Sequence, residues 1–305
     1  MAEKVAYFIF RGTGMDGKYQ DSLYKIYQSA VDNIGEERSF IYNGPGTYQN
    51  QAGWFGWISP LEWYRYNMSY LGTVTGFHGP NSWDETIEDA FNKIKQMVPQ
   101  PERLYFAGHS RGAITAFMLA NKLANDPSLK AIKITITAFD PVIGITGNYR
   151  QDQTTLAENV ESCQTFVASE CSLIGFTSIV PSVSATTESR THKVPTHHNG
   201  VIGLDIGWNF LNHASLNTDT AQLCLDSTLH QFNLPCSFKK VYRKPSTDDL
   251  SKLKSGPNGI GYNKRVHIDK STKLLRHTEL VSEIHETLIF YNREGSEETS
   301  FKHEI

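Results

Sequence analysis

The sequence predicts an α/β fold in which a mostly parallel sheet is flanked by helices. Short apolar runs alternate along the chain with amphipathic stretches, and this strand–helix–strand order is typical of parallel sheets with crossover helices. A chain of 305 residues, 39% of them hydrophobic, is long enough to bury such a sheet without disulfides or a structural metal.

The expected elements follow from periodicity and from glycine and proline punctuation. The apolar run 104–107 has the continuous character of a central strand, and residues 21–34 repeat their apolar positions at helical spacing until Gly35 ends the helix. Strands are expected at 5–10, 39–42, 104–107, 131–139, 165–168 and 191–194, and helices at 21–34, 83–97, 113–124, 204–216 and 271–290. The rest of 172–194 is expected to be irregular, and 239–273 a surface loop or small subdomain.

Charge and hydropathy exclude several classes of protein. The 29 basic and 32 acidic residues give a net charge of −3, so no basic surface for nucleic acid is expected. The longest apolar runs are too short for a membrane span, and the N-terminal run is too short for a signal peptide. We therefore expect a protein that is cytoplasmic at synthesis.

The cysteines and histidines predict no metal ion and no cofactor. The cysteines lack zinc-finger spacing and no HExxH sequence occurs. They are Cys163, Cys171, Cys224 and Cys236, expected as reduced thiols, with a Cys163–Cys171 bridge left open for an oxidising compartment.

The strongest functional signal is Gly108-His-Ser110-Arg-Gly112, between an expected buried strand and an alanine-rich helix. A nucleophilic serine needs a tight strand-to-helix turn, and small residues two positions before and after it allow that turn to form. The bare pattern arises by chance in about one chain in ten of this length, so the strand and helix around it carry the assignment. We predict that Ser110 is a nucleophile.

A serine nucleophile needs a base and an orienting acid, which in hydrolases of this type follow it in the chain. Asp140 ends the next expected strand, on the edge where the turn opens, and Asp205 is the second candidate for the acid. The base is expected at His197 or His198, in a loop behind the strand 191–194.

The transition-state oxyanion needs two donors. The amide of Arg111 at the helix N-terminus is one, and the turn at Gly12 and Thr13 is expected to supply the other. His109 lies inside the turn and is assigned to substrate binding instead of base chemistry.

Five short motifs resemble one family. They lie at 10–14 (Phe-Arg-Gly-Thr-Gly), 42–47 (Tyr-Asn-Gly-Pro-Gly-Thr), 108–113 (Gly-His-Ser-Arg-Gly-Ala), 139–142 (Phe-Asp-Pro-Val) and 195–199 (Pro-Thr-His-His-Asn). Together, over about residues 4–216, they resemble the bacterial α/β-hydrolases that include the phospholipase effectors of type VI secretion. The resemblance selects His198 over His197 and implies an α/β-hydrolase-like sheet. Arg11 stands where the family has Asp, the second motif is one residue shorter, and the glycine-rich continuation after His198 is missing.

The resemblance also implies ester hydrolysis on lipids and delivery into a rival or host cell by a specialised secretion system. The partners that it implies are a lipid or other ester substrate, a transiently contacted membrane surface, and an immunity or secretion-apparatus protein.

The motifs predict one catalytic domain at 1–235 and a C-terminal extension at 236–305 packed on it. An aromatic-rich insertion is expected at about 48–80, and it is either a buried insertion core or an acyl-binding wall, with Trp54, Phe55 and Trp57 as candidate substrate-binding residues. An amidase or peptidase using the same residues, an esterase for soluble substrates, and a non-catalytic binding module of the same fold remain alternatives.

Overall fold

The computed structural model describes residues 4–13, 15, 20–44, 83–143, 150–170, 177–204, 214–236, 265–268 and 275–276. The strands are β1 (Val5–Phe10), β2 (Ser39–Tyr42), β3 (Arg103–His109), β4 (Lys133–Phe139), β5 (Val160–Glu170), β6 (Thr177–Val180), β7 (Val183–Ser184), β8 (Glu188–His197), β9 (Arg265–Ile268) and β10 (Leu275–Arg276). The helices are α1 (Ser22–Ile34), α3 (Trp83–Gln96), α4 (Arg111–Asn125), α5 (Gln151–Thr154) and α6 (Ala214–Gln231), with single 3₁₀ turns η1 (Glu36–Arg38) and η2 (Gly200–Ile202).

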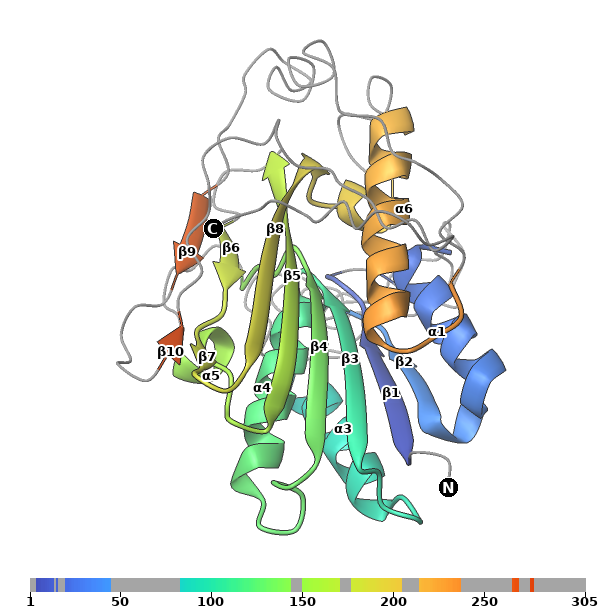
Figure 1. Cartoon of the computed structure of the whole chain (residues 1–305), viewed down its shortest axis with the longest axis vertical. Helices are drawn as coiled ribbons and strands as arrows, with labels where there is room; N and C mark the ends of the chain where they lie inside the picture. The colour runs from blue at the N-terminus through green and yellow to red at the C-terminus, as the bar shows by residue number, and fades with distance from the viewer. Residues whose placement is uncertain are drawn as a thin grey trace, which may run out of the picture.

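Six strands form one sheet in the order β2-β1-β3-β4-β5-β8, and every neighbouring pair is parallel. Their arrowheads therefore point the same way in Figure 1, and their carboxyl ends share one edge. The predicted fold class, an α/β fold with a mostly parallel sheet flanked by helices, is confirmed. Ligands bind at this edge in open α/β sheets, so the carboxyl edge is where a site is expected.

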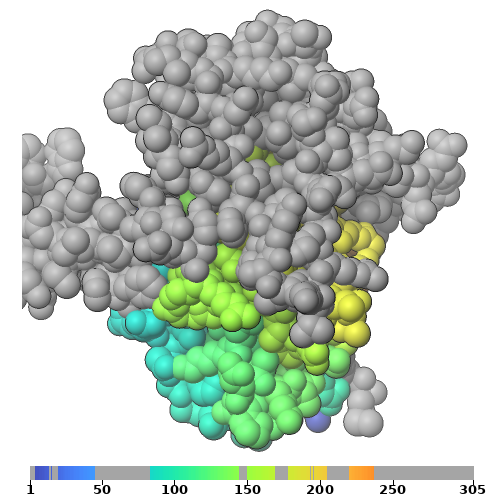
Figure 2. Space-filling model, turned by 90° about the vertical axis from the view of Figure 1, so that its left-hand side faces the viewer, coloured from blue at the N-terminus to red at the C-terminus, as the bar shows by residue number. Residues whose placement is uncertain are grey.

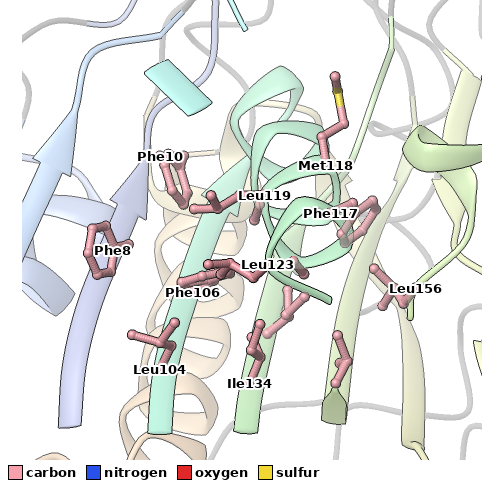
Figure 3. Packing of buried hydrophobic residues seen from close by; sticks show 14 of the residues in the cluster. Phe8, Phe10, Leu104, Phe106, Phe117, Met118, Leu119, Leu123, Ile134 and Leu156 are labelled. Carbon is pink, nitrogen blue, oxygen red and sulfur yellow. The ribbon is translucent and has the colours of Figure 1, made fainter. Parts of the chain in front are cut away.

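Helices cover both faces of the sheet (Figure 1). On one face α3 and α4 pack mainly through apolar side chains, among them Phe106 of β3 and Phe117 of α4 (Figure 3). On the other face α1 and α6 pack on Tyr7 and Tyr105, whose rings stack 4.8 Å apart. That second face includes polar links, for example the Tyr7 hydroxyl, which donates to the carbonyl of Phe232 at 3.0 Å.

The first helix begins and ends where its sequence predicts. Asp21 is the N-cap, and its carboxylate accepts a hydrogen bond from the N–H of Tyr24 at 2.8 Å. Gly35, the C-cap of the helix, has a φ of 93°, a backbone conformation in which a residue with a side chain would be strained. The predicted helix at 21–34 is thus confirmed apart from its first residue, which caps it.

The region after β4 differs most from prediction. Residues 177–197, expected to be mostly irregular, form β6, β7 and β8, and the short strand expected at 165–168 is the eleven-residue β5. Serine and threonine gave this region the composition of a loop, but threonine is β-branched and is favoured in strands. The helix expected at 204–216 does not begin at residue 204, which follows η2 outside any helix, and residues 205–213 lie outside the described residues. The helix α6 runs from residue 214 to residue 231.

Two small sheets join the last part of the chain to the segment between β5 and β8. Strand β9 pairs with β6 in parallel, and β10 pairs with β7 in antiparallel register. The pairing of β10 places a strand where a helix was expected at 271–290. Figure 2 views the molecule from another side, with cyan and green atoms from the region of α3 and α4 beside lime-green atoms that follow residue 150.

Several predictions lie outside the described residues: the aromatic insertion with Trp54, Phe55 and Trp57, and the second acid candidate Asp205.

Cys163 is a free thiol, so the bridge left open to Cys171 is wrong, and burial raises the pKa of the Cys163 thiol to about 12. None of the helices within the described ranges has the length and apolarity needed to cross a membrane.

Candidate active site

Ser110 sits on a strained turn between β3 and α4. Its φ of 55° and ψ of −124° lie outside the regions that a side chain adopts readily, and such strain is held only where the surrounding structure enforces it. The N–H of Ser110 donates to the carbonyl of Phe139 at 2.9 Å, and its carbonyl accepts from the N–H of Ala113 at 3.1 Å. These are the features of a nucleophile elbow, with the serine 4% exposed.

The two glycines of the motif are required by close backbone contacts. A Cβ added to Gly108 would lie 2.5 Å from the carbonyl oxygen of Gly112, and one added to Gly112 would lie 2.2 Å from that of Phe10. Real Cβ atoms do not approach backbone oxygens so closely, so both positions exclude any side chain. The glycines two residues before and two residues after Ser110 are therefore needed for the tight turn to form, as the sequence motif predicts.

Asp140 and His198 form a buried hydrogen-bonded pair. The Nδ1 atom of His198 lies 2.5 Å from Oδ2 of Asp140, and the aspartate is fully buried while the histidine is 9% exposed. An imidazole held through Nδ1 presents Nε2 as its remaining nitrogen, which is the tautomer that a base acting on a serine needs. Within the residues described, the acid chosen from the sequence and the histidine selected by the resemblance are thus in direct contact.

Chain position explains how these residues reach one edge. Ser110, Asp140 and His198 each follow directly after the last residue of a strand, which is β3, β4 and β8 respectively. Because all three strands are parallel, their carboxyl ends meet at the same edge of the sheet. The N–H of Val142 also donates to the carbonyl of Ser110 at 3.4 Å, which ties the segment after Asp140 to the elbow.

His109 packs against His198 and is 1% exposed. Its Nε2 atom lies 3.0 Å from the carbonyl oxygen of His198, and the two ring centroids are 4.5 Å apart. The histidine of the elbow therefore contacts the backbone and ring of the candidate base. That position differs from the open one expected of a substrate-binding residue.

The first turn of the chain lies against the elbow. A Cβ added to Gly12 would lie 2.6 Å from Nδ1 of His109 and 3.2 Å from Cβ of Ser110, and one on Gly44 would lie 1.5 Å from the carbonyl oxygen of Gly12. The turn with Gly12 and Thr13 thus approaches the serine through backbone. It lies beside Arg111, the first residue of α4, and its role as an oxyanion donor stays a prediction.

The side chain of Arg111 holds the turn and the elbow together, a role that the sequence analysis missed. Its Nε donates to the carbonyl of Ile143 at 3.0 Å, and a terminal nitrogen donates to the hydroxyl of Thr13 at 3.1 Å. The residue is 5% exposed, and burial lowers the pKa of Arg111 to about 10. The signal available in the sequence was an arginine inside an otherwise small and apolar motif.

Arg11, which departs from the resembled family, is also buried. Its Nε lies 3.9 Å from Oδ2 of Asp21, and its guanidinium carbon is 6.0 Å from the ring centroid of Tyr24. Desolvation raises the pKa of Asp21 despite the nearby cation. Arg11 thus joins the start of the turn at Gly12 to the N-terminus of α1.

No protein-family model and no curated protein matches the chain. Among solved structures, the chain is similar to an uncharacterized protein from Pseudomonas aeruginosa, with a TM-score of 0.41, 15% identity, and coverage of 75% of this chain and 45% of that one. It is similar to Est1E from Butyrivibrio proteoclasticus in a structure with ferulic acid bound, with a TM-score of 0.41, 10% identity, and coverage of 76% and 90%. It is also similar to the Tle1 effector bound to the VgrG spike of the type 6 secretion system, with a TM-score of 0.33, 15% identity, and coverage of 67% and 52%.

The chain spans about half the length of the first and third of these proteins. All three TM-scores lie below 0.5, so none of these similarities assigns a function to the chain.

Proposed function

We propose that the protein is a serine hydrolase that cleaves carboxylic esters. The observation that carries the proposal is the pairing of a strained Ser110 with the buried Asp140–His198 hydrogen bond at the same edge of the sheet. Strain at a buried serine is costly and persists where it serves function. A buried carboxylate aimed at Nδ1 of a histidine is the arrangement that activates a serine hydroxyl.

The reaction follows from these roles. Oγ of Ser110 attacks the ester carbonyl carbon while Nε2 of His198 takes the hydroxyl proton, and Asp140 stabilises the imidazolium. The backbone donors of Arg111 and of the turn at Gly12 and Thr13 stabilise the oxyanion. The imidazolium then gives its proton to the leaving alcohol. Water, deprotonated by His198, cleaves the acyl-enzyme and releases the acid, and the proton returns to Ser110.

We propose further that the ester is a lipid and that the protein acts as a secreted antibacterial or host-directed effector. This part is supported by the sequence resemblance and by the aromatic residues of the insertion, which include Trp54 and Trp57. An acyl-binding wall there predicts faster turnover of micellar than of monomeric substrate. Equal rates on both would favour a hydrolase of soluble esters.

The central experiment is labelling with a fluorophosphonate probe, which requires the nucleophile, the base and the oxyanion donors together. The wild-type protein should be labelled at Ser110, and Ser110→Ala should lose both labelling and at least about 10⁴-fold of its turnover of a short-chain p-nitrophenyl ester. Ser128→Ala, which removes an exposed hydroxyl bonded to Asp126, is the matched control and should behave as wild type. Retained activity in Ser110→Ala would contradict the proposal.

A panel of matched esters and amides then decides between the ester hydrolase and the amidase alternative. Turnover of the amides at rates comparable to the esters would replace the proposed substrate class. An unlabelled wild-type protein would favour a binding module.

A further inference from the structure

The two oxygens of the Asp140 carboxylate are held by different partners. Oδ2 contacts His198, whereas Oδ1 accepts a hydrogen bond from the hydroxyl of Ser178 at 2.6 Å and another from the N–H of Ala168 at 3.0 Å. Both Asp140 and Ser178 are fully buried. A carboxylate that is bonded at both oxygens has its plane fixed, and the orientation of the histidine depends on that plane.

Backbone contacts fix the position of the Ser178 hydroxyl. Ser178 belongs to β6, which lies outside the six-stranded sheet, and it forms an antiparallel bridge with Val142. The next residue, Ile179, donates its N–H to the carbonyl of Pro141 at 2.8 Å. The two residues that follow Asp140 in the chain are thus paired with the strand that carries the hydroxyl.

Strand β6 is itself paired with the last part of the chain. It forms a parallel two-stranded sheet with β9, in which Ser178 is opposite Val266. A segment more than one hundred residues after the acid in sequence therefore lies beside the strand that orients it.

We propose that Ser178 is a positioning residue for the acid of this site, and that β9 keeps it in place. The proposal rests on the proposed function in one respect, namely that Asp140 is the acid. Ser178 acts through Asp140 on His198 and touches no reacting atom. The C-terminal extension is then part of the catalytic apparatus.

Removing the Ser178 hydroxyl has a defined electrostatic consequence. A carboxylate that loses a hydrogen-bond donor keeps more of its negative charge, which favours the protonated form of the neighbouring imidazole. The pKa of His198 should therefore rise. The titratable side chains near the pair include His109, whose ring lies against that of His198, and His197, the preceding residue in the chain. The substitution Ser178→Ala leaves these in place.

The first test compares Ser178→Ala with Ser178→Thr, which keeps a hydroxyl in a strand position suited to a β-branched residue. In the alanine variant the pKa of His198, followed by NMR of labelled histidine, should rise by about half a pH unit or more. Its kcat should fall by about three- to thirtyfold with KM unchanged, and the acid limb of the pH profile should move to higher pH. The threonine variant should lie close to wild type in all three measurements.

Ser184→Ala is the control, because Ser184 is a buried serine of the neighbouring strand β7 whose hydroxyl contacts Thr186 and Thr187. An unchanged pKa of His198 in Ser178→Ala, or an equal change in Ser184→Ala, would overturn the proposal. The NMR measurement does not depend on turnover, so it separates this failure from a failure of the proposed function, which would be an inactive and unlabelled wild type.

The second test concerns β9 and uses a double-mutant cycle. Val266→Pro weakens the pairing of β9 with β6 and should lower kcat by about threefold in the wild-type background. In the Ser178→Ala background the same substitution should have little further effect, because the hydroxyl that β9 positions is gone. An unchanged kcat in Val266→Pro, or equal effects in both backgrounds, would overturn the role given to β9.

Discussion

The face of the sheet covered by α3 and α4 and the carboxyl edge of the same sheet are both buried but differ in composition. On the covered face the buried side chains are mostly apolar, with Phe106, Phe117 and Leu123 all at 0% exposure (Figure 3). At the carboxyl edge the buried side chains include the ionisable groups of Asp140 and Arg111, which are 0% and 5% exposed.

The two regions stabilise different properties. Apolar burial contributes to folding in proportion to area, whereas burial of a charged group costs free energy unless its partners replace the lost water. At the edge, hydrogen-bond partners replace the lost water and fix the positions of the buried charged groups. Asp140 has partners at both oxygens, and Arg111 contacts two loops. Substitutions on the covered face should therefore change stability, and substitutions at the edge should change turnover.

The largest effect is expected at the edge, from Asp140→Asn. An asparagine presents an amide donor to Nδ1 of His198 and stabilises the wrong tautomer, so kcat on a p-nitrophenyl ester should fall by about 10³- to 10⁴-fold. The midpoint of thermal unfolding should change little. The control is Asp89→Asn, which removes a half-exposed carboxylate paired with Lys93. A kcat within about threefold of wild type would remove Asp140 from the role of acid.

On the covered face, Phe117→Ala should produce the opposite result. The side chain is fully buried between α4 and the sheet, so its loss should lower the free energy of unfolding by about 3–5 kcal/mol, measured by urea denaturation. The kcat per folded molecule should stay unchanged. Val98→Ala, at a site 92% exposed, should change stability by less than about 0.5 kcal/mol. A large loss of kcat in folded Phe117→Ala would break the division between the two regions.

The sequence predicted the central strands and helices because each is defined by local pattern. The strands β1 and β4 are continuous or β-branched apolar runs, and α4 begins at the motif that a strand-to-helix turn requires. It did not predict β6 and β7, and it predicted only residues 191–194 of β8, because pairing with β5 and β9 decides the structure there. Such pairing joins segments far apart in the chain, and no local pattern encodes it.

The candidate site divides in the same way. Ser110 and Asp140 follow recognisable strands, so they could be assigned from order and spacing, and the resemblance selected the histidine that contacts the acid. The supporting residues could not be assigned. Ser178 lies in a stretch with the composition of a loop, and the contacts of Arg111 with Thr13 and Ile143 exist only in three dimensions.

Arg111 allows the finest test of the comparison, because it belongs to the edge and yet is a buried structural link. Lysine at this position keeps the charge but has one nitrogen, so it cannot hold both Thr13 and Ile143 in the fork geometry of a guanidinium. Arg111→Lys should lower kcat/KM by about tenfold, and it should slow inactivation by the fluorophosphonate to a similar extent. The reason is that the turn at Gly12 and Thr13 is proposed to stabilise the oxyanion in both reactions.

Thr13→Val is the matched variant, since it removes one of the two hydrogen bonds and leaves the guanidinium on Ile143. Its effect on kcat/KM should be smaller, about threefold, and the loss should fall on kcat and not on KM if the turn acts only in the transition state. If Arg111→Lys lowered the unfolding midpoint but left kcat/KM unchanged, the guanidinium would contribute to stability and not to turnover, as the side chains of the covered face do. The edge would then owe its catalytic geometry to the backbone of the turn and the elbow alone.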